Sequence, residues 1–124
     1  MEISLAVPKD RQVVESYGDW QFKVSGHQFQ GSVIVFPDRS EAWPISGFEE
    51  LTAQSLMPVT ASGQIEVLLV GCGTRMQMIT PELRGEMRKH GVSIEPMDTG
   101  AACRTYNVLL AEGRAVAAAL IAIE

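Results

Sequence analysis

Short runs of apolar residues, separated by turn residues, occupy the first third of the chain. Over residues 20–24 apolar and polar side chains alternate, which predicts a strand with Trp20, Phe22 and Val24 on one buried face. Residues 33–36 are continuously apolar and predict a strand covered on both faces. A third run covers 41–45, and glycine, proline and aspartate separate the three. We therefore predict an N-terminal antiparallel meander.

The pattern changes to helix signals after residue 45. Ser46 with Glu49 three residues later matches a capping box and predicts a short helix that Met57-Pro58 ends. Residues 65–70 form an apolar run rich in β-branched side chains, which stops at the glycine-containing segment 71–73. This run predicts a buried central strand.

The second half of the chain alternates strands and helices. Thr80 and Pro81 supply an N-cap and a first-turn proline for a helix through His90. A strand over 92–97 precedes a second helix, which extends to residue 112 and is closed by Gly113. Residues 114–123 predict a last strand. Strand-helix-strand order of this kind indicates an α/β fold with right-handed crossovers and helices on the faces of the sheet.

Composition restricts the class of protein. The 124 residues are 46% hydrophobic and 20% charged, which fits one globular domain over residues 1–124. The longest apolar stretch, 115–123, is about half of the roughly 20 residues that a membrane-spanning helix needs. Residues 1–5 lack a basic region and a long apolar run, so we expect no secretory signal and a cytoplasmic protein, peripheral to a membrane at most through a partner.

Charge and cysteine content restrict the kinds of molecule that the chain is expected to bind. The net charge is −5 with acids and bases interspersed, which argues against nucleic-acid binding and leaves a protein partner or a small ligand. The two cysteines show no C-x-x-C or zinc-ligand spacing, so we expect free thiols, no metal and no cofactor. Self-association through exposed sheet edges stays open.

Candidate chemistry gathers at one edge of the predicted sheet. Loops that follow parallel strands meet at the carboxyl edge, so the segments after 65–70 and 92–97 are expected to face one crevice. The candidate binding residues there are Gly71, Cys72, Gly73, Arg75, Asp98, Thr99, Cys103, Arg104 and Asn107. Gly71-x-Gly73 lacks the remaining residues of a phosphate loop and is interpreted as a strand-ending turn.

Cys103 is the most chemically suggestive of these residues. Its place in the first turn of a helix, beside Arg104, favours the thiolate. A cysteine nucleophile also needs a base, and His27 and His90 are predicted to lie elsewhere. Three interpretations remain: a buried small side chain, a redox or ligand contact, and a nucleophile. No recognisable catalytic set is present, so we predict a binding or assembly protein rather than an enzyme.

Other candidates also have two interpretations. Asp98 fits a helix cap better than an acid catalyst, and Asn107 either binds a cleft ligand or bonds within the core. Trp43 is expected to be buried, or to anchor a partner if exposed. Four methionines near the crossovers suit a core or an adaptable binding surface. They are Met76, Met78, Met87 and Met97.

Residues 97–114, with the sequence MDTGAACRTYNVLLAEGR, closely resemble a family of domains of unknown function. Further marks of that family appear in the same order, as GSVIV at 31–35, AWP at 42–44, LVGCG at 69–73 and PELR at 81–84. One eukaryotic branch of the family is the third assembly factor of the mitochondrial complex I alpha subcomplex. The resemblance implies a three-layer α/β sandwich with a mixed central sheet. It supplies no catalytic residues, and its hallmark run maps onto residues 98–107.

Two functional hypotheses follow. The resemblance implies an assembly-type protein, for which the expected partner is membrane respiratory machinery. The alternative is a small-molecule or thiol-redox protein that uses the crevice around Cys72 and Cys103, and it requires a thiol pKa well below about 8.5.

Overall fold

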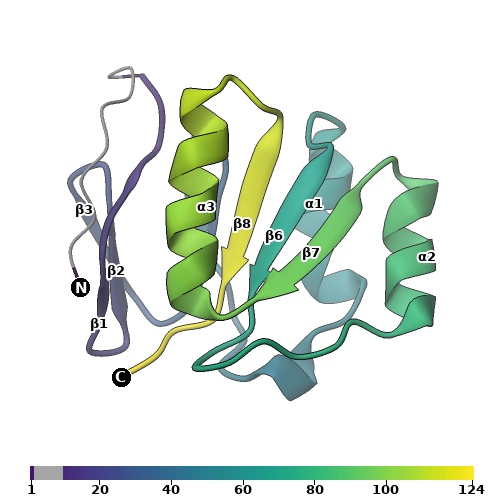
Figure 1. The fold of residues 1–124 in the computed structure, drawn as a ribbon, viewed down its shortest axis with the longest axis horizontal. Helices are drawn as coiled ribbons and strands as arrows, with labels where there is room; N and C mark the ends of the chain where they lie inside the picture. The colour runs from purple at the N-terminus through teal and green to yellow at the C-terminus, as the bar shows by residue number, and fades with distance from the viewer. Residues whose placement is uncertain (2–9) are drawn as a thin grey trace.

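Residues 10–124 fold into two sheets and three α-helices (Figure 1). The computed structural model describes residue 1 and residues 10–124, so most of residues 1–5, on which the expectation of no secretory signal rests, lies outside the described residues. The strands are β1 (Val14–Gly18), β2 (Gln21–Val24), β3 (His27–Gln30), β4 (Val33–Val35), β5 (Ser40–Ala42), β6 (Val67–Gly71), β7 (Ser93–Met97) and β8 (Val116–Leu120). The helices are α1 (Met57–Ser62), α2 (Pro81–Lys89) and α3 (Thr99–Ala111), with short 3-10 turns η1 (Phe48–Glu50) and η2 (Gln54–Leu56).

The main sheet is mixed. Its strand order is β5-β4-β8-β6-β7, in which β6 is parallel to β7 and β8, whereas β4 is antiparallel to β5 and β8. The smaller sheet, β1-β2-β3, is antiparallel. Helices α2 and α3 are the crossovers of the parallel part. The predicted α/β class with strand-helix-strand crossovers is therefore confirmed.

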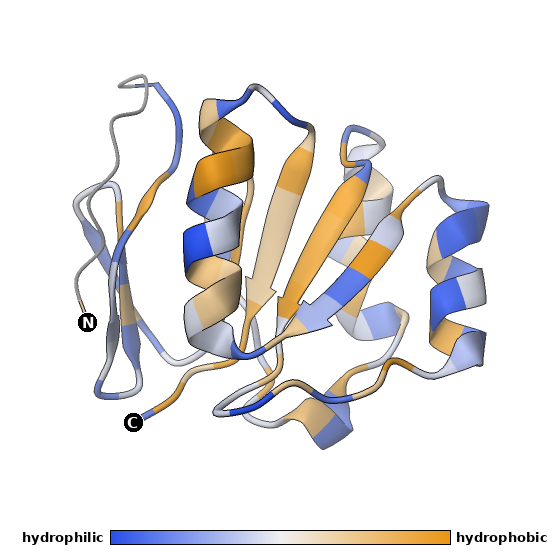
Figure 2. Ribbon diagram, viewed as in Figure 1, coloured by the Kyte–Doolittle hydropathy of each residue, from blue (hydrophilic) through white to orange (hydrophobic). Residues whose placement is uncertain are grey.

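Three layers result because alternate residues of the main sheet point to opposite faces. On β8, Ala117 and Ala119 pack in a core with residues of α1 and α2, whereas Ala118 and Leu120 pack in a second core beneath α3. The small sheet shares that second core. Figure 1 shows α3 in front of the main sheet and α1 behind it. In Figure 2 apolar residues dominate β6 and β8, which matches their burial on both faces.

The N-terminal meander is only partly as predicted. Strands β1 to β3 form it, but β4 and β5 leave to join the main sheet. The residues of β4 explain the difference, because Val33 and Val35 enter the core under α3 while Ile34 enters the core on the other face. A strand that is apolar on both faces needs a packing layer on each face. By pairing with β8, β4 joins the main sheet, which has a core on each of its faces.

Both crossover helices have the predicted ends. The hydroxyl of Thr80 accepts a hydrogen bond of 3.2 Å from the Leu83 amide, with Pro81 in the first turn of α2. Asp98 caps α3 by accepting 2.9 Å from the Ala101 amide. Gly113, with a φ of +77°, ends α3 in the left-handed conformation that glycine adopts most easily.

Two turns differ from the sequence-based expectations. Glu50, not Glu49, makes the cap near η1, because its carboxylate accepts bonds from the amides of Ser46 and Gly47, both at 3.0 Å. These bonds lower the pKa of Glu50. Met57-Pro58 begins α1 instead of ending a helix, since proline is tolerated in the first turn, where amides lack helical partners.

Trp20 also departs from its predicted position. Phe22 and Val24 are buried as expected, but Trp20 is 56% exposed and lies in the β1–β2 turn. Asp19 and Trp20 have φ values of +54° and +61°, which is the two-residue hairpin turn that asparagine or aspartate followed by glycine usually forms. The turn, not the alternating pattern, therefore decides where this side chain points.

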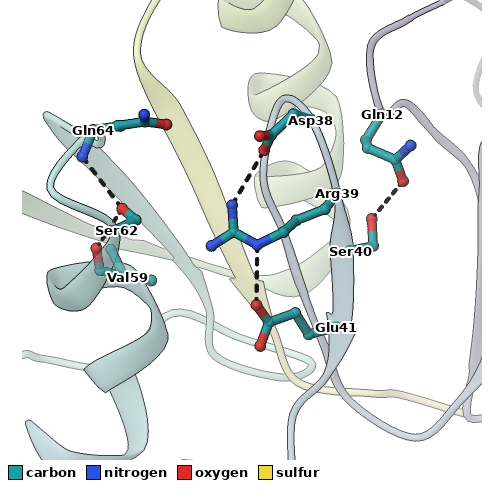
Figure 3. Close-up of polar contacts among 8 residues, drawn as sticks. All are labelled: Gln12, Asp38, Arg39, Ser40, Glu41, Val59, Ser62 and Gln64. Carbon is teal, nitrogen blue, oxygen red and sulfur yellow. Dashed lines mark hydrogen bonds and ion pairs between the residues drawn. The ribbon is translucent and has the colours of Figure 1, made fainter.

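A small charge cluster closes the β4–β5 turn (Figure 3). The Arg39 guanidinium contacts the carboxylates of Asp38 and Glu41, each at 3.2 Å, and lies 3.9 Å from the centre of the Phe36 ring. All three charged side chains are substantially exposed, so we assign the cluster a modest contribution to stability.

No helix in residues 1 and 10–124 is long and apolar enough to cross a membrane.

Candidate functional site

The loops after β6 and β7 meet as predicted. The Thr99 amide donates a hydrogen bond of 2.9 Å to the Gly73 carbonyl, and the Gly73 amide donates 3.0 Å to the Thr99 hydroxyl. The Cys72 amide adds a bond of 2.8 Å to the carbonyl of Met97. Residues 71–75 and 97–104 therefore form one carboxyl edge.

Thr99 connects that edge to the end of the chain. Its buried hydroxyl donates a hydrogen bond of 2.8 Å to the Ile121 carbonyl and accepts a hydrogen bond from the Gly73 amide. Gly71 permits this contact, because a Cβ at position 71 would lie 3.0 Å from the Thr99 Cα and 3.1 Å from a Leu120 methyl. Both Thr99 and Gly71 thus have structural reasons for their residue types, and the Thr99 hydroxyl is engaged in hydrogen bonds within the fold.

Asn107 is buried and bonded within the fold. Its side-chain oxygen accepts a hydrogen bond of 3.1 Å from the Val14 amide, and its side-chain nitrogen donates a hydrogen bond of 2.9 Å to the Val14 carbonyl. Strand β1 is an edge strand of the small sheet, and the Asn107 side chain makes the pair of hydrogen bonds that the backbone of a neighbouring strand would otherwise make to Val14. Of the two interpretations of Asn107, the core-bonded amide is therefore the observed one.

Arg104 is exposed at the start of α3. Its Nη1 donates 3.2 Å to the Tyr17 hydroxyl, which links α3 to β1. Gly100 makes room for the tyrosine, since a Cβ there would lie 2.6 Å from the same hydroxyl. The Arg104 guanidinium keeps donors that can contact another molecule.

The two cysteines do not share a crevice. Cys72 packs in the core beside α1 and α2, whereas Cys103 is fully buried in the core beneath α3, on the other face of the sheet. Burial raises the pKa of Cys103 to about 12, which outweighs the opposite effect of the Arg104 charge, and burial also raises the pKa of Cys72. Of the three interpretations of Cys103, the buried small side chain is therefore the observed one, because desolvation has a larger effect on the thiol pKa than the helix end and Arg104, which favour the thiolate.

Neither histidine is placed to act on a thiol at this edge. His27 is exposed in β3, and His90 is exposed at the C-cap of α2. Within the described part of the chain, no three His, Cys, Asp or Glu side chains are grouped so that they could hold a metal ion.

A depression of about 460 Å³ adjoins the carboxyl edge. Its walls include Trp20, Phe48, Thr74 and Arg75 together with residues 121–124. The Trp20 amide donates 2.8 Å to the Ile123 carbonyl, which fixes the hairpin turn beside the chain end. We call Trp20, Arg75, Asp98 and Arg104 the carboxyl-edge surface. The alternating pattern over residues 20–24 predicted Trp20 on a buried face, whereas the turn signal at Gly18-Asp19 indicates the hairpin in which it lies.

The remaining candidates divide between core and surface. Trp43 is buried, and its indole nitrogen donates 2.8 Å to the Ser55 carbonyl, so it does not anchor a partner. Met87 is fully buried, whereas Met76 and Met78 are exposed in the loop between β6 and α2. Of the two interpretations of the methionines, Met87 therefore fits core packing, and Met76 and Met78 fit an adaptable binding surface.

The fold makes this chain a three-layer α/β protein with a mixed central sheet. The chain belongs to the family described as "Protein of unknown function (DUF498/DUF598)", whose profile matches residues 14–121. The resemblance that the hallmark run indicated is thereby confirmed.

Relatives of two kinds are similar to this chain. NADH dehydrogenase (ubiquinone) 1 alpha subcomplex assembly factor 3 of Xenopus tropicalis is 35% identical over 109 residues, which cover 87% of this chain and 60% of the relative. An uncharacterised protein of Rhodobacter capsulatus is 35% identical over 108 residues, 87% of this chain and 82% of that protein. The crystal structure of an outer membrane protein from Bartonella henselae has a TM-score of 0.86 and 38% identity, covering 94% of this chain and 98% of that one.

Proposed function

We propose that this chain is an assembly-type binding protein that associates with a protein subunit of a membrane respiratory complex. The observation that carries the proposal is the 35% identity, over 87% of the chain, to a protein named as a complex I assembly factor. The chain spans 60% of that relative's length, so the shared part is this α/β fold. On this proposal the chain works in the cytoplasm and reaches a membrane through its partner.

The arrangement of the hallmark residues supports a binding function. Thr99, Cys103 and Asn107 are buried, and the polar side chains among them bond within the fold. They hold the N-terminus of α3 against the loop after β6 and against β1. The hallmark run thus builds a rigid edge, and a rigid edge reduces the ordering cost of binding a partner.

The exposed groups at that edge suit a protein interface. Trp20, Arg75 and Arg104 are exposed, and tryptophan and arginine are enriched among the residues that contribute most to protein binding. Trp20 and Arg75 line the same depression, and Arg104 reaches the hairpin of Trp20 through its bond to Tyr17. The carboxyl-edge surface is therefore our proposed interface.

The test is affinity capture with the tagged chain from detergent-solubilised membranes of the source organism. An Arg75→Glu, Arg104→Glu double variant alters the carboxyl-edge surface without changing the core. An Arg88→Glu, Arg114→Glu double variant is the matched control, since these arginines are exposed on other parts of the chain. Circular dichroism establishes that both variants fold.

We expect the wild-type chain and the control to enrich subunits of one respiratory complex, and the carboxyl-edge variant to lose them. Capture of the same subunits by all three proteins would remove the carboxyl-edge surface from the proposal. Failure of the wild-type chain to enrich any respiratory subunit would contradict the assembly-type function itself.

A further inference from the structure

We propose that the groove between α1 and α2 binds a cationic amphipathic helix of a partner protein. This inference rests on the proposed protein-binding function for the nature of its ligand, but it concerns a different surface. The groove adjoins the carboxyl-edge depression at Phe48 and is otherwise lined by other residues.

The groove consists of two adjoining hollows of about 390 and 480 Å³. Ala53 and Glu86 line both hollows, so the two lie side by side along α2. Helix α2 forms one wall along its length, from Glu82 in the first hollow to His90 in the second. Nine helical residues extend about 13 Å, which matches two to three turns of a docked helix.

Apolar side chains form the floor and the rims. Phe48, Leu51 and Leu83 are half-buried and pack on the core beneath. Met78 and Met57, one at each hollow, are 78% and 54% exposed. Methionine side chains adapt to the shape of a partner, and they are frequent at surfaces that bind apolar helix faces.

The charge of the groove is acidic. Glu82 and Glu86 lie one turn apart on the same face of α2, and both line the groove. Neither lysine nor arginine occurs among the described residues that line either hollow. Glu86 contacts Lys89 at 3.6 Å, but that pair is exposed and exchanges easily for a partner's cation. A ligand with lysine or arginine beside its apolar face therefore complements this groove.

The walls favour a helix over an extended segment. The described residues that line the two hollows belong to helices, 3-10 turns and loops, and none belongs to a strand, so the walls offer no strand edge with which an extended ligand could pair. An extended segment would bury its own amides and carbonyls without partners, which costs free energy for each group. A helix satisfies these groups internally and presents only its apolar face.

The experiment uses the full chain and a display library of 15-residue peptides. Each peptide keeps leucines along one helical face and has flanking positions randomised among Lys, Glu, Gln and Ser. Selected peptides are labelled with fluorescein for anisotropy titrations and are mapped on the isotope-labelled chain by amide chemical shifts. The variants are Glu82→Gln, Glu86→Gln for the groove and Glu95→Gln, Glu112→Gln as the charge-matched control.

We expect selection to enrich lysine over glutamate and the shifts to centre on Ala53, Met78 and Glu86. The groove variant should bind the selected peptide about tenfold more weakly, which corresponds to about 1.4 kcal/mol, and the control should bind like the wild type. Selection of glutamate flanks, shifts confined to other surfaces, or equal loss in both variants would overturn the proposal. Occupation of the groove by a second copy of the chain, seen as concentration-dependent shifts at the same residues without peptide, would overturn it as well. Since the carboxyl-edge variant should bind this peptide normally, failure here is distinguishable from failure of the respiratory partner.

Discussion

Replacing Asn107 with alanine should destabilise the fold far more than replacing an exposed residue of the same helix. The change removes the two hydrogen bonds that the Asn107 side chain makes to Val14 in β1, of 3.1 and 2.9 Å. The Val14 amide and carbonyl then stay buried without partners, because Val14 is fully buried and no longer has the side chain of Asn107 at its edge.

The size of the effect follows from those two groups. An unsatisfied buried donor or acceptor costs about 1–3 kcal/mol, so the two together should lower the free energy of unfolding by about 2–6 kcal/mol. Arg104→Ala is the control on the same helix. It removes one exposed bond of 3.2 Å to Tyr17 and should cost about 0.5 kcal/mol or less.

Urea unfolding followed by circular dichroism measures both variants against the wild type. The slope against urea should stay constant, which would place the effect in the folded state. A loss below about 1 kcal/mol for Asn107→Ala would refute the conclusion that this side chain is a structural clamp. It would also restore Asn107 as a candidate ligand of the carboxyl edge.

Three further predictions concern single positions. Gly113→Val should lower the free energy of unfolding by about 1–2 kcal/mol, because a β-branched residue is strained at a φ of +77°; unchanged thermal unfolding would exclude this. Trp20→Gly should raise stability by about 0.5–1 kcal/mol by relieving the positive φ of the hairpin turn, while partner capture falls; a loss of stability would show that the indole packs more than its exposure indicates. Cys103 should make the fold sensitive to alkali. Because its folded pKa of about 12 lies above its ordinary 9.0, the unfolded state loses the proton first, so the contribution of Cys103 to stability is constant below pH 9 and falls by about 1.4 kcal/mol per pH unit between pH 9 and 12. Cys103→Ala should have a shallower slope between pH 9 and 12, and equal slopes would contradict the burial argument.

Local signals gave the second half of the fold correctly. The Thr80 and Asp98 caps, the positive φ of Gly113 and the apolar run of β6 depend on neighbours within a few residues, so the sequence contains the reason for each. The meeting of the loops after β6 and β7 follows from parallel strand order, which the alternation of strands and helices indicated.

The candidate site was less predictable because its side chains have distant partners. Asn107 bonds to Val14, 93 residues away, and Thr99 bonds to Ile121 across the sheet. Cys103 has a helix-end position that favours the thiolate, yet full burial has the larger effect on its pKa. Burial depends on what packs over α3, and that information is not local to the sequence around Cys103.

The sequence by itself thus determined the class of fold, the crossover helices with their caps, and membership of the family through residues 97–114. Periodicity and capping act over a few residues, which is why they can be interpreted without coordinates. Only the tertiary structure decided that β4 and β5 join the main sheet, that the two thiols lie on opposite faces, and that Trp20 is exposed beside Arg75. These features depend on which strands pair and which layer covers each face, and such long-range choices are set by the free energy of the whole core.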